Sequence, residues 1–488
     1  MIKINYGIIL KVASVVVFCF SLIMLVPVFV SWGSGGSLNI PLSTILLATI
    51  GAGIAVFFAT KNVKTKLGKR EGYLIVVVSW LLAGLIGSFP YLLLGESTFI
   101  DSLFESVSGL TTTGATMFND IEELPKSILI WRSLTQWIGG MGIIVLTVAI
   151  FPLLGVGGVE LFVAESPGPT SNKIHPRIKE TAKRLWLLYI GLSIVLIIIL
   201  KLEGMLWFDA VNHGLTTIAT GGFSTKNSSI AYFDSPVIDY TILIFMFIAG
   251  INYSLIYAGI KGRFSKFWAS GEFKAYLSFV IVSIGITSLF ILLNTDLRLE
   301  QSFRNAAFQV ISIITTTGYI TADYTSWHPS ITMFFFCLLF AGACAGSTSG
   351  GIKFVRHLVF AKNSMLEFKR LLHPNGLIRL RIDNNIVRPK ILTHVLVFLM
   401  IYLFIFLLGT MVMTFIMSDF NDPLISAAGA VATSLGNVGP GIGDLGPLDT
   451  FQNIPPSGKL VLSLIMLLGR LELFSVLIIF TPSFWRVN

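Results

Sequence analysis

Apolar residues gather in long runs, separated by short polar stretches, along the whole chain of 488 residues. A helix that crosses a bilayer needs about 20 mostly apolar residues. The first run is longer than the apolar part of a secretory signal, and no cleavage site follows it. Runs of spanning length lie near 6–32, 40–60, 73–95, 131–155, 184–202, 236–260, 274–294, 330–360, 391–417 and 458–482. They predict an all-α polytopic membrane protein with ten spans, because a membrane β-barrel would show alternating short segments instead.

A shorter, half-apolar segment stands between the two spans of each of the last four pairs. These segments are 99–118, 207–225, 301–321 and 421–441. Each holds about 10–14 helix-forming residues, too few to cross a bilayer, so each is expected to be re-entrant. The predicted architecture is two N-terminal spans and four span–re-entrant pore helix–span repeats in a pseudo-four-fold arrangement around one pore. The expected units are 1–70, 71–183, 184–273, 274–390 and 391–488.

Each short segment ends in small residues that include a glycine, with a hydroxyl residue two positions before it. The glycines are Gly114, Gly222, Gly318 and Gly436, and the hydroxyl residues are Thr112, Thr220, Thr316 and Ser434. Thirteen residues before the first three glycines stand Asp101, Asp209 and Asn305, which are residue types that favour helix N-caps. Nine residues before them stand Glu105, His213 and Gln309. The fourth segment fits this register less well, with Pro423 and Ala427 at the two positions.

Non-helical backbone at bilayer depth is tolerated only where it is buried in protein or lines a water-filled path. Glycine allows a positive φ that turns successive carbonyl groups to one side, and rings of carbonyl oxygens replace the hydration shell of a cation. Small residues also pack membrane helices together, but four copies in one register favour a cation filter. The predicted ion-binding residues are Thr111, Thr112, Thr113, Gly114, Thr220, Gly221, Gly222, Thr316, Thr317, Gly318, Ser434, Leu435 and Gly436.

The four-fold unit and the motifs "TTTGA", "ATGGFST", "TTTGY" and "TSLGNVGPG" resemble the membrane subunits of the Trk/Ktr/HKT potassium-transporter superfamily. The two extra N-terminal spans and the ending "GRLELFSVLIIFTPSFW" are similar to the bacterial Trk branch. The resemblance implies potassium uptake across the bacterial cytoplasmic (inner) membrane, with one pore per chain in a homodimer. A filter that is one glycine deep leaves a sodium-permeable or poorly selective transporter as the alternative.

The resemblance also implies a cytosolic regulatory subunit of the RCK type (TrkA-like), which binds a nucleotide (ATP/ADP or NAD) and controls opening. No cofactor is expected in this chain itself, and K⁺ is the transported ion. Membrane lipid is the other expected partner. Whether K⁺ moves alone or with H⁺ or Na⁺ is open at this point.

The run "AGACAGSTSGG" at 341–351 interrupts the second span of the third repeat. Its glycines make two overlapping G-x-x-x-G patterns, which are typical of helix contacts, but eleven small residues in succession also favour an unwound loop. The superfamily has an intramembrane gate loop at the matching position. The resemblance therefore implies a gate formed by Gly342, Ala343, Cys344, Ala345, Gly346, Ser347, Thr348, Ser349, Gly350 and Gly351.

Arg470 lies in the middle of the last apolar run. A charge at that depth usually faces the protein interior or a water-filled cavity. Arg470 is either a structural residue that binds carbonyl groups at the end of a pore helix or, as the resemblance implies, a positive barrier in the ion path that acts with the loop. Glu472, two residues later, points elsewhere on a helix and is not expected to be its counter-ion.

Charged residues make up 12% of the chain, about half the usual share in a soluble domain. The net charge of +9 comes from basic blocks at 61–70, 173–184, 261–274 and 353–390, which with the two termini hold 26 of the 34 basic residues. This asymmetry follows the positive-inside rule. It places both termini in the cytoplasm and gives no reason to expect a nucleic-acid partner.

An intramembrane enzyme is the remaining alternative class. The only dinucleotide-like motif, "GIGDLG" at 441–446, is followed by proline instead of a helix. The three cysteines have no metal-ligand spacing, and the six histidines are scattered. The chain is therefore not expected to be an enzyme.

Overall fold

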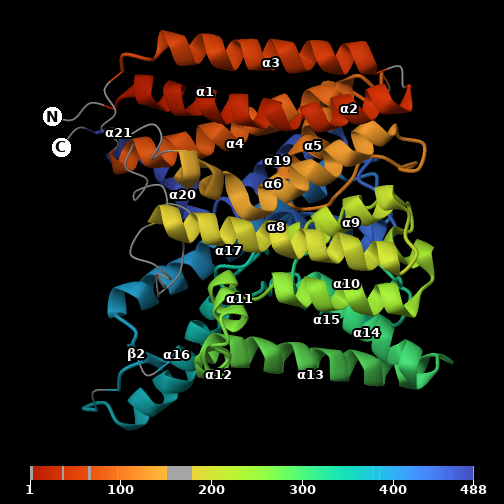
Figure 1. Cartoon of the computed structure of the whole chain (residues 1–488). Coiled ribbons are helices and arrows are strands. Elements are labelled where there is room, and N and C mark those ends of the chain that lie inside the picture. Colours follow the sequence, from red (N-terminus) through yellow and green to blue (C-terminus); the bar gives the residue numbers. More distant parts are fainter. Residues whose placement is uncertain are drawn as a thin grey trace.

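The computed structural model describes residues 4–35, 38–63, 68–95, 97–150, 178–376, 378–383 and 385–486. Within these ranges the chain is helical apart from loops and one hairpin. The hairpin pairs β1 (Arg381–Ile382) antiparallel with β2 (Asn385–Ile386). The predicted all-α class is confirmed (Figure 1).

The two predicted N-terminal spans are present. The first consists of α1 (Tyr6–Ile23) and α2 (Leu25–Ser34), which together form one apolar span, and the second is α3 (Asn39–Ala59). α1 packs against both α3 and α4, so α3 lies at the edge of the molecule, at the top of Figure 1.

Four repeats follow, each with a long span, a short helix and a second span. Repeat one contains α4 (Lys69–Leu92), α5 (Phe99–Leu110) and α6 (Lys126–Ile150). Repeat two contains α8 (Ile178–Leu202), α9 (Trp207–Ala219), α10 (Pro236–Ala249), α11 (Tyr253–Ile260) and α12 (Ser265–Ala269). Repeat three contains α13 (Gly271–Asn294), α14 (Leu299–Ile314), α15 (Pro329–Leu338) and α16 (Phe354–Leu372). Repeat four contains α17 (Pro389–Ile416), α18 (Pro423–Gly436), α19 (Pro456–Arg470), α20 (Phe474–Leu477) and α21 (Pro482–Trp485), and the 3₁₀ turns are η1 (Ser229–Phe233), η2 (Gly443–Leu445) and η3 (Ile478–Phe480).

Six helices among the described residues are long and apolar enough to cross a membrane, and two bent helix pairs bring the number to eight. The other two expected spans correspond to α6 and to the divided pair α15 and α16. The last part of the predicted span 131–155 and most of the basic block 173–184 lie outside the described residues.

The short helices begin earlier than the sequence suggested. α5 starts at Phe99 and α9 at Trp207, so the expectation of an N-cap at Asp101 and at Asp209 is wrong. Asp101 instead occupies the third helical position and forms a capping box with Thr98. An acidic residue is favoured in the first helical turn as well as at the cap, and sequence alone does not separate the two positions. The expected N-cap Asn305 is also wrong, because α14 starts at Leu299.

Every second span is broken, where the sequence predicted a break in the third repeat only. α6 contains a non-helical residue at Gly142. The chain bends by 107° between α10 and α11, and by 106° between α19 and α20. Between α15 and α16, residues 339–353 are not helical. The breaks at small-residue positions "GGMG" and "AGIN" resemble the third one in composition, but each is too short to be recognised as an interruption.

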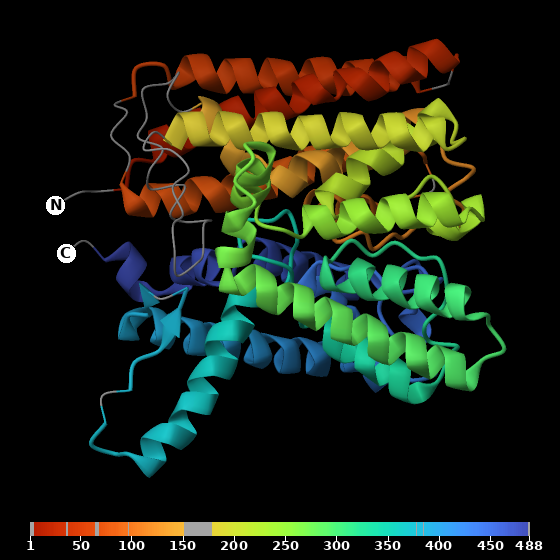
Figure 2. The same cartoon turned by 60° about the horizontal axis from the view of Figure 1, so that its bottom comes forward.

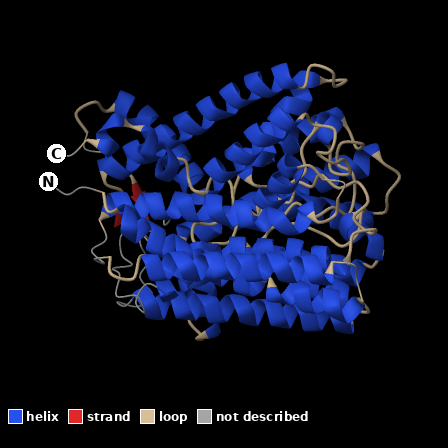
Figure 3. Cartoon of the chain, turned by 90° about the horizontal axis from the view of Figure 1, so that it is seen from above, coloured by secondary structure: helices blue, strands red, loops and turns tan. Residues whose placement is uncertain are grey.

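Contacts between repeats close a ring. α6 of repeat one packs against α9 of repeat two, α10 of repeat two against α14 of repeat three, α16 of repeat three against α17 of repeat four, and α19 of repeat four against α5 of repeat one. One apolar cluster joins the N-terminal spans with repeats one and four, and a second joins repeats two and three. Most of the long helices run in nearly one direction, with α16 as the clear exception (Figure 2), and loop segments lie within the bundle as well as at its ends (Figure 3). The last residues of the four short helices are buried, so these helices end inside the protein.

Candidate ion pathway

The four short helices end in the same backbone turn. Each chain leaves its helix through a hydrogen bond from a backbone N–H to the carbonyl five residues earlier, a common helix-ending motif. The four pairs are Thr113 N to Ser108 O, Gly221 N to Thr216 O, Thr317 N to Ser312 O and Val438 N to Thr433 O, at 2.8–3.0 Å. The residue before each donor has φ near +55°: Thr112 (54°), Thr220 (53°), Thr316 (57°) and Asn437 (53°). The residue after each donor is a glycine with positive φ: Gly114 (81°), Gly222 (79°), Gly318 (81°) and Gly439 (106°). We call these four stretches the filter turns.

The fourth filter turn lies three residues later than predicted. Helix α18 continues through Ser434 and Leu435 to Gly436, so these three residues belong to the helix end, and Gly439 takes the place that the sequence assigned to Gly436. The reason is that Asn437 replaces the threonine of the other repeats. Asparagine adopts the left-handed region more readily than most residues, so Asn437, Val438 and Gly439 form the same turn without a hydroxyl residue at its first position. A search for hydroxyl residues therefore misses it.

The glycines of the four filter turns pack against one another in a closed circle. A methyl group added to any of them would collide with a carbonyl oxygen of the next repeat. The distances from such a methyl group are 2.3 Å from Gly114 to Gly221 O, 2.0 Å from Gly222 to Thr317 O, 2.1 Å from Gly318 to Val438 O and 2.7 Å from Gly439 to Thr113 O. The contacts therefore run through repeats one, two, three and four and return to one, and they bring the four glycines around a single axis.

Polar side chains at the filter turns are fully buried. Thr111 bonds to Thr113, and Thr315 to Thr317, through their hydroxyl groups at 2.7 and 2.8 Å. Among the described residues, Thr112 Oγ1 and Asn437 Oδ1 are buried and have no hydrogen-bond partner. Oxygens of this kind are costly to bury without a ligand or a water molecule, and they can serve as cation ligands.

The small-residue segment 341–351 contacts the ends of the short helices. The backbone N–H of Gly350 donates to Thr316 Oγ1 at 2.7 Å. The hydroxyl of Thr348 donates to the carbonyl of Ile218, at the end of α9, at 3.1 Å. The backbone N–H of Cys344 donates to the carbonyl of Gly250, where α10 ends, at 3.0 Å. The segment 341–351 therefore packs against the ends of the short helices of repeats two and three.

Arg470 is the last residue of α19 and binds this segment. Its guanidinium donates to the carbonyl of Thr348 at 3.1 Å and to the carbonyls of Gly139 and Gly140 in α6 at 2.5 and 3.2 Å. Glu472 forms its ion pair with Arg356, as expected of a residue that points away from Arg470. Arg470 therefore links repeat four, the segment 341–351 and the break in α6.

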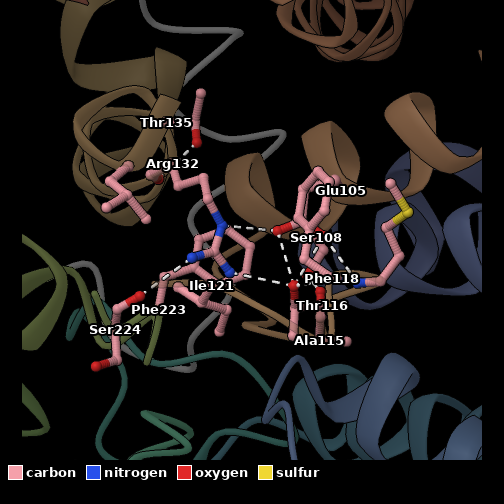
Figure 4. A network of polar contacts seen from close by, with 12 residues as sticks. Glu105, Ser108, Ala115, Thr116, Phe118, Ile121, Arg132, Thr135, Phe223 and Ser224 are labelled. Atoms are coloured by element: carbon pink, nitrogen blue, oxygen red, sulfur yellow. Dashed lines mark hydrogen bonds and ion pairs between the residues drawn. The ribbon is translucent and has the colours of Figure 1, made fainter. Parts of the chain in front are cut away.

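One buried ion pair behind the filter turns was not predicted (Figure 4). Arg132 Nε in α6 lies 2.8 Å from Glu105 Oε1 in α5, and the two side chains are 1% and 0% exposed. Arg132 also donates to the carbonyl of Ser224 at 3.1 Å and to Thr116 Oγ1 at 3.2 Å. Charged residues buried inside a membrane protein often mark a functional site, and this signal was present in the sequence. The pairing of Glu105 with Arg132 cannot be read from the sequence, because it depends on how α5 packs against α6.

Comparison with known proteins identifies the family. A family model described as a cation transport protein, TrkH, matches residues 42–487. The chain is 39% identical to the Trk system potassium uptake protein TrkH of Escherichia coli K12, over 99% of this chain and 100% of the relative. It is 35% identical to the TrkG protein of the same organism, over 91% of this chain and 90% of that relative.

A solved structure agrees with the fold. The crystal structure of the potassium transporter TrkH from Vibrio parahaemolyticus matches with a TM-score of 0.88 and 35% identity, and covers 99% of this chain and 100% of that one. The resemblance found in the sequence and the four-repeat architecture are both confirmed, and the alternative of an enzyme is excluded. The chain belongs to the TrkH family of cation transport proteins.

Proposed function

We propose that this protein takes up K⁺ across the bacterial cytoplasmic membrane through the four filter turns. The closed circle of glycine–carbonyl contacts around Gly114, Gly222, Gly318 and Gly439 is the observation that carries the proposal. The names of its relatives, potassium uptake proteins of Trk systems, support K⁺ as the ion.

In this mechanism K⁺ loses water as it enters the filter, and backbone carbonyl oxygens replace the lost ligands. The four short helices end at the filter turns, so the partial negative charge of their C-termini favours a cation there. The buried oxygens of Thr112 and Asn437 add ligands on the helix side. Because each filter turn has one glycine of positive φ at this level, a sodium-permeable transporter is the competing function.

We further propose that the segment 341–351 is the gate and that Arg470 stabilises its closed form. The bonds from Gly350 to Thr316 and from Arg470 to Thr348 support this role, since they join the segment to a filter turn and to α19. Opening requires these bonds to break together. A regulatory subunit that pulls on the cytosolic ends of the broken spans would supply the energy.

The remaining parts of the proposal concern assembly and orientation. We place both termini and the basic blocks in the cytoplasm, as the positive-inside rule favours. The names of the relatives refer to a Trk system, which supports a multi-component assembly. We expect two copies of this chain and a cytosolic RCK-type subunit that binds a nucleotide.

The test is cation flux into reconstituted vesicles, with K⁺, Rb⁺, Na⁺ and Li⁺ measured separately. Gly318→Ser places a side chain where a methyl group would lie 2.1 Å from Val438 O, and we expect it to abolish the preference for K⁺ over Na⁺. Gly285→Ser is the matched control, because Gly285 lies in α13 and faces open space. Unchanged selectivity in Gly318→Ser would contradict the proposal, and a parental flux for Na⁺ equal to that for K⁺ would favour the sodium-permeable alternative.

A further inference from the structure

The four filter turns differ in the side chain that supports them from the pore helix. The supporting position lies nine residues before each filter glycine and holds Glu105, His213, Gln309 and Ala430. Glu105 accepts hydrogen bonds from Thr116 Oγ1 at 3.1 Å and from the backbone N–H of Met117 at 2.9 Å. His213 Nε2 bonds to Ser224 Oγ at 2.9 Å. Gln309 reaches Thr321 Oγ1 at 3.4 Å only, and Ala430 has no polar group. Support thus weakens from the first repeat to the fourth.

Arg132 joins the residues that directly follow the first and second filter turns. Its guanidinium binds Glu105 and Thr116 of the first repeat and the carbonyl of Ser224 of the second. It also stacks over the ring of Phe223, 4.0 Å from the ring centroid, directly after Gly222. Figure 4 shows these groups converging on the one guanidinium from both repeats.

A second polar residue on the same face of α6 acts on the same turn. Gln136 lies one helical turn after Arg132, and positions four apart share a helix face. Its Nε2 donates to the carbonyl of Gly221 at 2.5 Å, and its Oε1 accepts from the backbone N–H of Phe223 at 3.0 Å. The residues on both sides of Gly222 are therefore held by α6.

Stability alone does not account for the ion pair. Replacing a buried ion pair by apolar residues of similar volume is often neutral or stabilising. Among the ion pairs of the described residues, this is the one in which both side chains are at most 1% exposed. The rigid fork of arginine is suited to fixing several acceptors at once, and partners behind a ligand set tune ion binding by orienting the ligands.

We propose that Glu105 and Arg132 are positioning residues, which hold the first and second filter turns in the shape that distinguishes K⁺ from smaller cations. The proposal rests on the proposed function, since it assigns a role within the same filter. Ion selectivity then depends unequally on the four repeats. The charged pair holds the first two filter turns, and the fourth turn has no charged residue at the matching position.

The test is Arg132→Lys, assayed by the flux ratio of K⁺ to Na⁺ in vesicles. Lysine keeps the charge next to Glu105 but cannot bind Thr116 and Ser224 at the same time. We expect the ratio to fall about tenfold, the lower end of the effect of removing a partner behind a metal ligand. Arg304→Lys is the matched control, because Arg304 lies in the pore helix α14, binds Asp239 of α10 at 2.5 Å and does not touch a filter turn in any described contact.

A second variant covers the case in which Arg132→Lys does not fold. Glu105→Gln with Arg132→Met removes both charges, so no unpaired charge is left buried, and we expect the same loss of selectivity. An unchanged ratio in the folded variants overturns the proposal, as does failure of both to fold while Arg304→Lys folds, since the pair would then be structural. Gly318→Ser separates the two ideas: if it loses selectivity and Arg132→Lys does not, only the positioning role fails.

Discussion

The first and fourth filter turns have the same backbone conformation, but they differ in the polar side chains that contact them. In the first, Ser108 Oγ donates to the carbonyl of Ala115 at 2.6 Å, and Arg132 and Glu105 hold the next residues. In the fourth, Thr433 Oγ1, at the position of Ser108, is buried and has no partner among the described residues. The four-fold symmetry is therefore a symmetry of backbone conformation, which the helix ends and glycines fix, and the side chains around it are free to differ.

The fourth turn has other means of support. Pro440 follows Gly439 and restricts the backbone, and the Tyr324 hydroxyl of the third repeat donates to the carbonyl of Gly441 at 2.7 Å. Asn437 Nδ2 donates to Thr113 Oγ1 of the first turn at 3.0 Å. The fourth filter turn is therefore held in part by hydrogen bonds to residues of the first and third repeats. A change in the first turn is expected to disturb the fourth as well.

The largest effect is expected from alanine at Gly439. The substitution adds a methyl group 2.7 Å from Thr113 O at a φ of 106°, which side chains rarely adopt, and we expect it to abolish selective K⁺ uptake. Gly436→Ala is the comparison, because Gly436 is helical and its added methyl group would lie 2.9 Å from Leu339 O. We expect this variant to lose some flux and to keep its K⁺ preference. The reverse result would restore the filter register predicted from the sequence.

A smaller effect, of opposite sign, is expected from Arg470→Ala. The arginine joins α19 of the fourth repeat to α6 of the first through the carbonyl groups of Gly139 and Gly140, and to the segment 341–351 through the carbonyl group of Thr348. One hydrogen bond from a charged group contributes about 1.5–3 kcal/mol, and each 1.4 kcal/mol is a factor of about ten in an equilibrium. We expect K⁺ flux without the regulatory subunit to rise about tenfold or more. A folded variant with no flux would instead make Arg470 a structural residue.

The third expected effect is on stability and not on ion flux, and it compares two equivalent positions. Glu105→Met leaves Arg132 charged, buried and without its carboxylate, which costs about 3–5 kcal/mol. Gln309→Met removes a side chain whose Oε1 has no partner among the described residues and is expected to change stability by about 1 kcal/mol or less. Thermal unfolding in detergent measures both. Equal destabilisation would show that the first turn is no more dependent on its support than the third.

Local patterns were enough to predict the spans, the short helices and the positions of three of the four positive-φ glycines that follow those helices. These features depend on residues that are close in sequence: apolar runs, and a threonine and a glycine at a fixed spacing. The fourth turn was predicted at the wrong position, because Asn437 matches the threonines of the other turns in backbone conformation but has no hydroxyl group.

Features that depend on packing were not visible in the sequence. The pairing of Glu105 with Arg132 joins two helices, and Arg132 reaches Ser224, 92 positions later. The breaks in α6, between α10 and α11 and after α19 involve only one to three residues each. Such short interruptions need the contacts of neighbouring repeats to be stable, because freed backbone groups inside a membrane must find partners.

We expect a cation to bind on the axis between the four filter turns. The most direct measurement is a structure of the protein determined in Rb⁺, with the ion located by its anomalous scattering. Rb⁺ is expected between the carbonyl oxygens of Thr113, Gly221, Thr317 and Val438, and the signal is expected to be lost in Gly318→Ser. Rb⁺ bound elsewhere, with none between these oxygens, would contradict it.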